Sequence, residues 1–444
     1  MDERNRIFTS KHKVRETLRV LLLHSKNKTS IKLKGGALYI ATLVSILIGI
    51  TLSLFILIAN YNQRNVVTFA QNSQLYYNLK SAFQLAQSGY FTSEQNNTWI
   101  KNQINDDSIK IKKLNWGAYV VICAQTKNRH QSLSHSGLFG THMTADTGLM
   151  MSDNGRPVGL IGAVVFKANC YLSHAGVKPA HVEGQSYTGS SENASFLKAS
   201  SNSIPPLNSE ILKGLKEEQE GLNVYLDSLA TVLPPVHDQP FDKKTLVCEI
   251  SLSRLSNLNL KNNLKLICSD VEIDSSCHFE NILILCSKVR FKKGFKGQVH
   301  VIASDSISME TNCDFIYPSS FILLPKENSG NNLNSIRFNK DCKFSGGILA
   351  INENQITNAT QKVFIKLSAE AEVNGLIYSS DYIHVEGTLN ACVIADKLLL
   401  QTPSAVYENH ILNCEINPKK YAQLMSVPLL FNQRNKLICC ATLY

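Results

Sequence analysis

The sequence predicts a mainly β protein: a transmembrane helix that continues into an amphipathic helix, followed by a parallel β-solenoid (β-helix) ectodomain with a helical insertion. Three observations support this prediction. An apolar segment without charge lies near the N-terminus, strand-like alternation begins near residue 109, and a repeat of 16 to 20 residues runs through residues 244–416. With 44% hydrophobic and 18% charged residues, the chain has enough apolar side chains to fill a core.

These changes of composition divide the chain into seven segments. They are a basic cytoplasmic tail (1–35), the transmembrane helix (36–59), the amphipathic helix (60–92), a β-rich region that supplies the first solenoid rungs (109–189), a linker with the helical insertion (190–240), the solenoid repeats (244–416) and a C-terminal cap or tail (417–444).

Residues 36–59 contain no charge and no proline. A helix of this length spans about 36 Å, which exceeds the ~30 Å hydrocarbon core of a bilayer. Residues 1–36 carry ten Lys or Arg and three acidic residues, whereas the opposite flank, residues 60–80, offers only Arg64 and Lys80. The positive-inside rule therefore places the N-terminus in the cytoplasm and residues 60–444 outside. A cleaved signal peptide is the alternative, although Ile58-Ala59-Asn60 matches its cleavage site poorly.

The helix is expected to continue beyond the membrane, because no proline occurs between residues 37 and 100. A stripe at helical spacing supports one helix of roughly 50 residues that ends near Gly89. The alternative is a separate second helix after a short break. The stripe consists of Phe69, Tyr76, Leu79, Phe83, Ala86 and Tyr90.

Strand patterns follow from residue 109. Residues 109–114 alternate and residues 116–123 are mostly apolar, whereas the polar residues 128–141 predict a loop. Short apolar runs within 146–189 predict further strands, and the Ser/Asn-rich residues 190–207 predict a surface linker.

A helix is predicted over residues 208–233. Leucine and isoleucine recur there at spacings near 3.6, Ser209 is the candidate N-cap, and Pro234-Pro235 ends the segment.

The repeats relate residues 267–273 to 285–291 and 302–308, and later residues 377–383 to 393–399. Each unit has an apolar run, a corner of small polar residues and a short alternating strand, which is typical of one rung of a parallel solenoid. Like residues then stack in ladders, with Cys268 above Cys286. The competing fold is an antiparallel β-sandwich, in which strands recur every 8–12 residues with hairpin turns.

All twelve cysteines follow the apolar segment. Their even number in an oxidising compartment allows disulfides, whereas free buried thiols are the interpretation favoured for the repeats. No CxxC pair is present, so the spacing does not predict a zinc site. The vicinal pair Cys439-Cys440 suits either an intermolecular bridge or packing under the last rung.

Asp270, Lys288 and Asp305 occupy equivalent repeat positions. Stacking would separate the two aspartates by about 9.6 Å, at the upper limit for an inverting glycosidase. Lys288 between them would keep both carboxylates ionised, so a solvated charge ladder is expected instead.

His174 and His181 flank a Gly/Pro turn near Glu183, and the sequence identifies no third partner for a metal or acid–base role, so a loop with titrating histidines is expected. The sequence therefore predicts no catalytic, cofactor-binding or metal-ligating residue, and no cofactor.

The basic leader, Lys34-Gly35-Gly36 and the long helix resemble the N-terminus of type IV pilins and pseudopilins over about residues 30–90. The glutamate of that pattern is replaced here by Ala41. Residues 37–420 are similar to uncharacterised single-pass bacterial membrane proteins with a β-solenoid ectodomain. Neither resemblance transfers catalytic residues.

The sequence thus predicts a membrane-anchored, non-enzymatic structural or assembly protein of the bacterial envelope, of the minor-pilin kind. It is expected in the inner (cell) membrane, with the ectodomain periplasmic or extracellular. Its expected partners are the lipid bilayer and proteins of an envelope assembly or copies of itself, and not nucleic acid. The alternative is a membrane-tethered polysaccharide-binding or polysaccharide-cleaving β-helix protein.

Overall fold

The structure is a computed structural model of the 444-residue chain. It describes residues 35–443, except for residues 89–90, 92–94, 102–106, 130, 144, 190, 221–228, 231–232, 327–332, 354–360, 423–424, 429 and 431–436. The predicted cytoplasmic tail lies outside the described residues. The chain divides into two compact units, Met1–Ser73 and Gln74–Tyr444. The fold is mostly β, with one long apolar helix.

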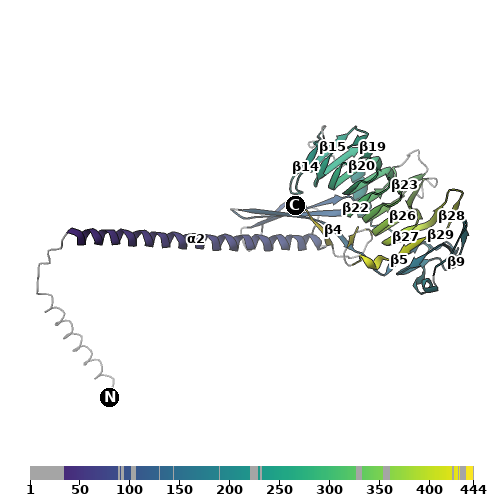
Figure 1. Cartoon of the computed structure of the whole chain (residues 1–444), viewed down its shortest axis with the longest axis horizontal. Helices are drawn as coiled ribbons and strands as arrows, with labels where there is room; N and C mark the ends of the chain where they lie inside the picture. The colour runs from purple at the N-terminus through teal and green to yellow at the C-terminus, as the bar shows by residue number, and fades with distance from the viewer. Residues whose placement is uncertain are drawn as a thin grey trace, which may run out of the picture. The chain divides into compact units, whose positions relative to one another are not determined.

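Helix α2 spans Gly35–Gln87 without interruption, which confirms the prediction of one long helix (Figure 1). Residues 36–59 are all exposed, and they include large apolar side chains such as Phe55 and Leu57. The helix is long and apolar enough to cross a membrane. The predicted end at Gly89 lies outside the described residues.

The serine and threonine hydroxyls of residues 36–59 all donate to carbonyl oxygens of the preceding turn. No hydroxyl of these four side chains therefore needs water, which suits an apolar surrounding. The bonds join Thr42 to Tyr39, Ser45 to Ala41, Thr51 to Ile48 and Ser53 to Gly49, at 2.8–2.9 Å.

The second unit begins within α2, whose last turns pack on an antiparallel sheet. Leu79, Ala82 and Ala86 are buried against Ile111 and Ile122 of this sheet. The strand order is β1-β2-β3-β4-β31, and β32 also pairs with β4. The bounds are β1 Trp99–Lys101, β2 Ser108–Trp116, β3 Tyr119–Lys127, β4 Ser132–His142, β31 Ser426–Val427 and β32 Ile438–Leu443.

The predicted apolar stripe of the helix is only partly correct. Leu79 and Ala86 are buried as expected, but Tyr76 is 60% exposed and Leu75 is buried in its place. The buried face therefore follows the i, i+4, i+7, i+11 spacing that begins at Leu75. Asn78 extends this face by donating to the Asp107 carboxylate at 2.6 Å.

Two expectations for the antiparallel sheet are wrong. The polar residues 128–141 are not a loop, because most of them form β4. The C-terminal residues are not a cap or tail either, since β31 and β32 return to pair with β4 on both sides of Gly140. In Figure 1 the yellow C-terminal strand accordingly lies beside the blue strands. The glycines of β4 leave room for this crossing, because a Cβ at Gly137 would stand 3.3 Å from the Cys439 sulfur.

The largest sheet is mostly parallel, and its pairing closes into a barrel-like sheet. Its early strands are β12 Leu197–Ala199, β13 Leu229–Ala230, β14 Val236–Asp238, β15 Leu246–Ile250, β16 Arg254–Leu255, β17 Asn259–Lys261, β18 Leu264–Cys268, β19 Asp270–Ile273, β20 His278–Phe291 and β21 Lys296–Met309. The later strands are β22 Asp314–Leu323, β23 Leu333–Phe338, β24 Lys343–Ala350, β25 Lys362–Leu367, β26 Glu372–His384, β27 Gly387–Gln401, β28 Val406–Glu408, β30 Cys414–Ile416, β5 Thr147–Met151, β7 Val165–Phe166 and β8 Asn169–Leu172.

Smaller elements complete the unit. They are the two-stranded sheet of β10 His181–Val182 and β11 Gln185–Ser186, the three-stranded sheet of β29 His410–Leu412, β6 Val158–Ile161 and β9 Val177–Pro179, the helix α3 Ser209–Gln219 and the 3-10 helices η3 Ser191–Phe196 and η5 Pro418–Lys420.

The predicted repeats pair with one another in parallel. Ile267 lies opposite Leu285, Leu285 opposite Ile302, and Ile377 opposite Val393, so the similarity of these segments is confirmed. Buried residues of successive strands thereby form inward ladders. One ladder runs through Val271, Val289, Ile307, Ile336, Ile365, Ile383 and Leu398.

Phenylalanines fill the middle of the closed sheet. Phe315 and Phe321 are almost fully buried, with ring centroids 4.8 Å apart, and Phe321 contacts Phe344 at the same distance. These rings pack edge-on or tilted, which aromatic pairs prefer over a face-to-face sandwich.

One outer face of the closed sheet is also apolar. Its ladder of Leu285, Ile302, Ile322 and Leu349 is covered by side chains of the antiparallel sheet and of α3. Trp116 is among them, and its indole Nε1 donates to the Asn281 carbonyl oxygen at 2.9 Å. Strands that are buried on both faces need nearly continuous apolar runs, which explains the apolar part of each repeat.

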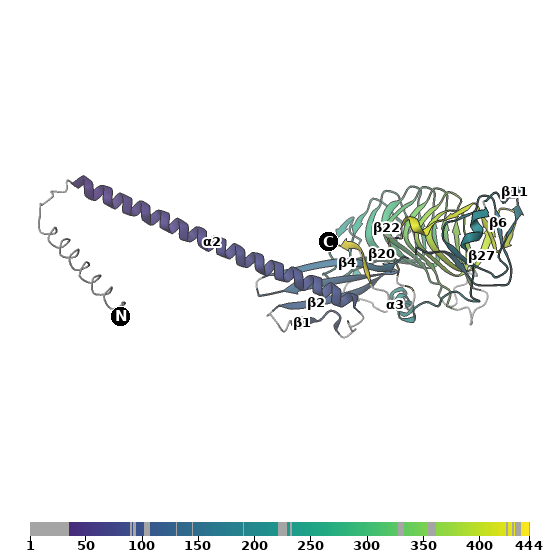
Figure 2. The ribbon, with the colours of Figure 1, turned by 90° about the horizontal axis from the view of Figure 1, so that it is seen from below.

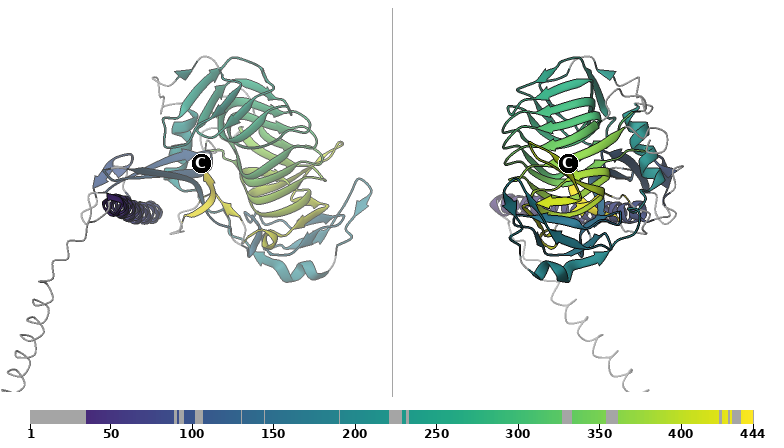
Figure 3. Two further views of the ribbon diagram at one scale, coloured as in Figure 1. Left: turned by 60° about the vertical axis from the view of Figure 1, so that its left-hand side comes forward. Right: turned by 90° about the vertical axis from the view of Figure 1, so that its right-hand side faces the viewer.

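The segment 146–189 does not supply the first rungs, because β5 pairs with β27, the strand of the last repeat. In Figure 3, right, the dark blue strands therefore follow the yellow ones at the lower end of the stack. Residues 190–207 are not only a linker either, since they include β12, which pairs with β8. These strands thus extend a second inward ladder, which runs from Ile377 through Val393 and Leu149 to Cys170.

The predicted helix over residues 208–233 is too long. Helix α3 spans Ser209–Gln219, residues 229–230 form strand β13, and residues 221–228 lie outside the described residues. The N-cap is Asn208 rather than Ser209, because the Asn208 side chain accepts the Glu210 N–H at 2.9 Å. Figure 2 shows α3 beside the antiparallel sheet.

Candidate functional site

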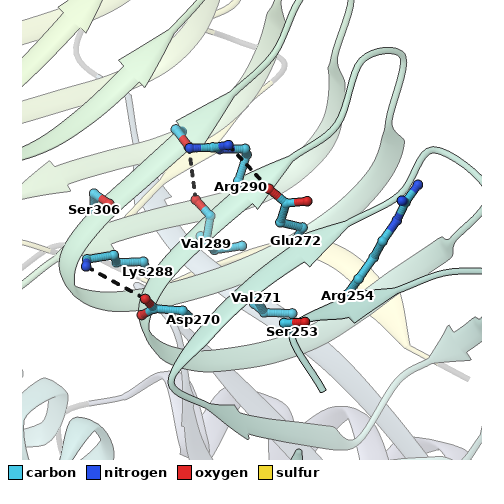
Figure 4. A pocket seen from close by; sticks show the side chains of 10 residues that line it. Ser253, Arg254, Asp270, Val271, Glu272, Lys288, Val289, Arg290 and Ser306 are labelled. Carbon is cyan, nitrogen blue, oxygen red and sulfur yellow. Dashed lines mark hydrogen bonds and ion pairs between the residues drawn. The ribbon is translucent and has the colours of Figure 1, made fainter. Parts of the chain in front are cut away.

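A charged groove of about 440 Å³ lies on an exposed face of the closed sheet, across the second half of its strands (Figure 4). Strands β16, β19, β20 and β21 supply its walls. The lining residues are Ser253, Arg254, Asp270, Val271, Glu272, Lys288, Val289, Arg290, Ser306 and Ser308.

Alternation along the strands produces this lining. Val271 and Val289 point into the core, so their neighbours point outward. Asp270 lies opposite Lys288 with 3.7 Å between carboxylate and ammonium, and Glu272 lies opposite Arg290 at 3.3 Å. The groove therefore carries opposite charges on successive strands.

Ion pairs shift the pKa values of four groups beside the groove. Arg254 hydrogen-bonds Asp274 and lowers the pKa of that carboxyl to about 2. Lys292 bridges Glu310 at 2.9 Å and Glu272 at 3.7 Å. The hydrogen bond to Glu310 raises the pKa of Lys292, and the same bond lowers the pKa of Glu310. Arg254, Asp274, Lys292 and Glu310 thus favour their charged forms at neutral pH.

This arrangement suits binding better than acid–base hydrolysis. A general acid at neutral pH needs a carboxyl whose pKa is raised, whereas Asp274 and Glu310, which bond the basic residues at the margin of the groove, have lowered pKa values. Surface ion pairs are worth about 0–1 kcal/mol, so a ligand can rearrange them at small cost. The groove offers exchangeable charges and the hydroxyls of Ser306 and Ser308 to a polar ligand.

The predicted ladder of Asp270, Lys288 and Asp305 is only half correct. Asp270 does pair with Lys288, but the next strand places Ser306, and not Asp305, opposite Lys288. The register shifts between Cys286 and Lys288, which moves Asp305 out of the ladder. The two aspartates therefore do not share a stacked row, and the predicted separation of about 9.6 Å does not apply.

The structure does not bring His174, His181 and Glu183 into one cluster. His174 bonds the Asp153 carboxylate at 2.7 Å, His181 bonds the Ser186 hydroxyl at 2.8 Å, and Glu183 accepts from Ser404. Hydrogen bonds from Ser173, Gly155 and His174 lower the pKa of Asp153. Over the part of the chain that the structure describes, no group of three or more His, Cys, Asp or Glu side chains is placed to hold a metal ion.

Glu272 and Arg290, the second ion pair of the groove, were not identified from the sequence. Glu272 and Arg290 occupy the same position in two repeats, and their opposite charges were a readable signal for a cross-strand pair. No comparable signal exists for the Arg254–Asp274 bond, because these residues occupy different positions of their rungs.

The cysteine ladder is confirmed, since Cys268 lies beside Cys286 on the neighbouring strand. All twelve cysteines are free thiols, and eight of them are buried. Cys439 on β32 is exposed, whereas Cys440 is half-buried beside Gly140. The vicinal pair thus lies in the antiparallel sheet and not under the last repeat.

No family model, no curated protein and no solved structure matches this chain.

Proposed function

We propose that this protein is a single-pass membrane-anchored structural or assembly component of a bacterial envelope, of the minor-pilin kind, without enzymatic activity. Its helix would cross the inner (cell) membrane with the N-terminus in the cytoplasm. The observation that carries the proposal is the division of α2 into an exposed apolar part and a last part that packs on an antiparallel sheet.

We further infer that the closed sheet is a parallel β-solenoid. Its register supports this inference, because consecutive repeats pair 18 residues apart at Ile267–Leu285, 17 apart at Leu285–Ile302 and 16 apart at Ile377–Val393. Similar steps with inward apolar ladders are the pattern of stacked rungs. Such a rod needs no ligand to be stable, and it suits a scaffold.

Two properties of α2 support the membrane anchor. Its apolar part has no charge, and its serine and threonine hydroxyls are bonded within the helix. Burial of this part in water-free surroundings then leaves none of these four hydroxyls unsatisfied. The helix-on-sheet packing of Leu79, Ala82 and Ala86 is the feature that supports a pilin-like head.

Alkaline carbonate extraction of membranes tests the anchor. The unchanged chain should remain in the pellet, whereas Ile48→Arg combined with Leu52→Arg should move into the supernatant, because each central Arg costs about 2.5–3.5 kcal/mol. Val66→Arg is the matched control, since Val66 is exposed on the same helix but lies outside residues 36–59. Release of the unchanged chain by carbonate would refute the anchor.

The mass of the N-terminus tests the minor-pilin part of the proposal. A mature chain that begins at Ala37 is the expected result, because prepilin processing removes the leader after the glycine of the resembling motif. A chain that retains the residues before Gly36 would refute this part and leave a plain membrane anchor.

Binding of a polysaccharide is the second candidate function, and the charged groove favours it. A glycan panel with the purified chain tests it. If binding is real, Glu272→Gln combined with Arg290→Ala should weaken it, whereas replacement of the Lys296–Asp314 pair outside the groove should not. A cleaving enzyme is refuted if Asp270→Asn with Asp305→Asn leaves turnover unchanged.

A further inference from the structure

Cys268, at the end of β18, and Cys286, in β20, lie side by side on neighbouring parallel strands. The preceding residues Ile267 and Leu285 are in register, so the two cysteines are adjacent as well. The Cys268 thiol donates to the carbonyl oxygen of Leu285, the residue before Cys286, at 3.8 Å. Directly opposed residues on neighbouring strands lie about 4.8 Å apart, within the Cα separation of about 4.4–6.8 Å that a disulfide bridges.

Both residues are half-buried, and each lies two residues before a residue of the charged groove, Asp270 or Lys288. A second pair provides the comparison. Cys313 and Cys342 precede the register partners Asp314 and Lys343, but both residues are 0% exposed. The chain thus contains two similar thiol pairs that differ in access to solvent.

We propose that Cys268 and Cys286 form a modification site, at which a small-molecule disulfide such as oxidised glutathione converts the two thiols into a disulfide between successive strands. The thiolate of Cys268 attacks one glutathione sulfur and releases one glutathione, which gives a mixed disulfide. The Cys286 thiol then attacks the Cys268 sulfur, forms the protein disulfide and releases the second glutathione. Two protein thiols are oxidised, one glutathione disulfide is reduced, and the protons pass to the released glutathione thiolates.

The order of attack follows from the surroundings of the two sulfurs. The neighbouring Cys268 thiol and the burial of the sulfur raise the pKa of the Cys286 thiol. Less thiolate is then available on Cys286, and Cys268 is the first nucleophile. The inference does not depend on the proposed function of the protein.

The bridge would link β18 to β20 and close a loop through residues 269–285. Cross-linking removes conformations from the unfolded chain. The oxidised protein should therefore unfold at a temperature a few degrees above that of the reduced protein.

Peptide mapping of the full-length chain in detergent micelles tests the proposal. The reduced protein is incubated with oxidised glutathione, alkylated and digested. Trypsin leaves both cysteines within residues 266–288, because no Lys or Arg lies between them. Additional cleavage after Glu272 and Glu280 separates them, so the disulfide joins residues 266–272 to residues 281–288.

The expected result is this linked peptide, formed at least tenfold faster than a Cys313–Cys342 link. Cys286→Ser should trap glutathione on Cys268, whereas Cys268→Ser should leave Cys286 mostly unmodified. Cys277→Ala is the control, since Cys277 lies between the pair but is fully buried, and the link should still form. Absence of the linked peptide in the folded chain, or equal rates for the two pairs, would overturn the proposal.

Discussion

Helix α3 is attached to the closed sheet by a buried ion pair, and this pair gives a sharp prediction. Glu218 of α3 accepts a hydrogen bond from Lys265 of β18, and their side chains are only 7% and 8% exposed. The Lys265 ammonium also lies over the Trp116 ring, 5.7 Å from its centroid. Glu218→Gln would leave the lysine charge buried without its counter-ion, at a cost of about 3–5 kcal/mol.

The same helix provides a matched control. Lys213 and Glu217 form an exposed i, i+4 pair at 3.8 Å, with side chains 77% and 42% exposed. Such pairs contribute about 0.3–0.5 kcal/mol, so Glu217→Gln should cost roughly a tenth of Glu218→Gln. The two substitutions make the same chemical change one residue apart, and only burial distinguishes them.

Denaturant unfolding of the full-length chain measures both costs, and Trp116 fluorescence reports locally because this ring contacts the pair. The double variant Glu218→Leu with Lys265→Met should recover most of the loss, since apolar residues often replace a buried ion pair without cost. The reasoning is refuted if Glu218→Gln costs no more than Glu217→Gln, or if the double variant is as unstable as the sum of the single variants.

Three further predictions concern the same unit. Burial lowers the pKa of His300 to about 3, below its unfolded value of about 6.5. Only the unfolded state then binds a proton between these two pH values. The free energy of unfolding should therefore decrease by about 1.4 kcal/mol for each pH unit by which the pH is lowered in this range, and His300→Gln should flatten this slope in acid titrations. Gly375 has φ 128° and no room for a Cβ, whereas Gly155 has φ 71° and open space around it. Gly155→Ala should cost about 1–2 kcal/mol for the left-handed backbone alone, and Gly375→Ala should lower the melting temperature further. Trp116→Phe leaves the buried Asn281 carbonyl without its donor and should cost about 1–3 kcal/mol in denaturant unfolding; an unchanged midpoint would contradict this.

The sequence predicted the long helix and the paired repeats because both signals are local. The uncharged residues 36–59 define the apolar part of α2 without reference to the rest of the chain. Residues 267–273 and 285–291 carry the same pattern and lie in register, so reading one predicts the environment of the other. Periodicity identifies an environment well when the partner is the next copy of the same pattern.

Pairing between distant segments left no such signal. Strand β4 pairs with strands from both ends of the second unit, and its glycines leave room for the side chains of Cys439 and Cys440. In the sequence these glycines and the polar residues around them are typical of a loop. The position of β5 beside β27 has the same cause, since the pairing of Leu149 with Val393 spans more than half of the chain.

At the candidate site, a single additional residue makes the predicted stacking of Lys288 with Asp305 wrong. The repeats aligned Lys288 with Asp305, but β21 has one additional residue between Ala303 and Ser306, which places Ser306 opposite Lys288. A shift of one residue exchanges inward and outward positions along a strand. After the shift, Val289 pairs with Ile307, so apolar residues still face each other in the core. Only the exposed neighbour of Lys288 differs from the prediction.

Strand β3 is the physical link between the end of α2 and the closed sheet. Its neighbouring residues Val121 and Ile122 are both fully buried, but in different clusters. Val121 packs with Trp116 against the outer ladder of the closed sheet, whereas Ile122 packs with Leu79 of α2. Because adjacent residues of a strand point to opposite faces, the antiparallel sheet is buried on both sides here. Neither contact surface can be exposed without opening an apolar core, so the last turns of α2, the antiparallel sheet and the closed sheet are expected to move as one body.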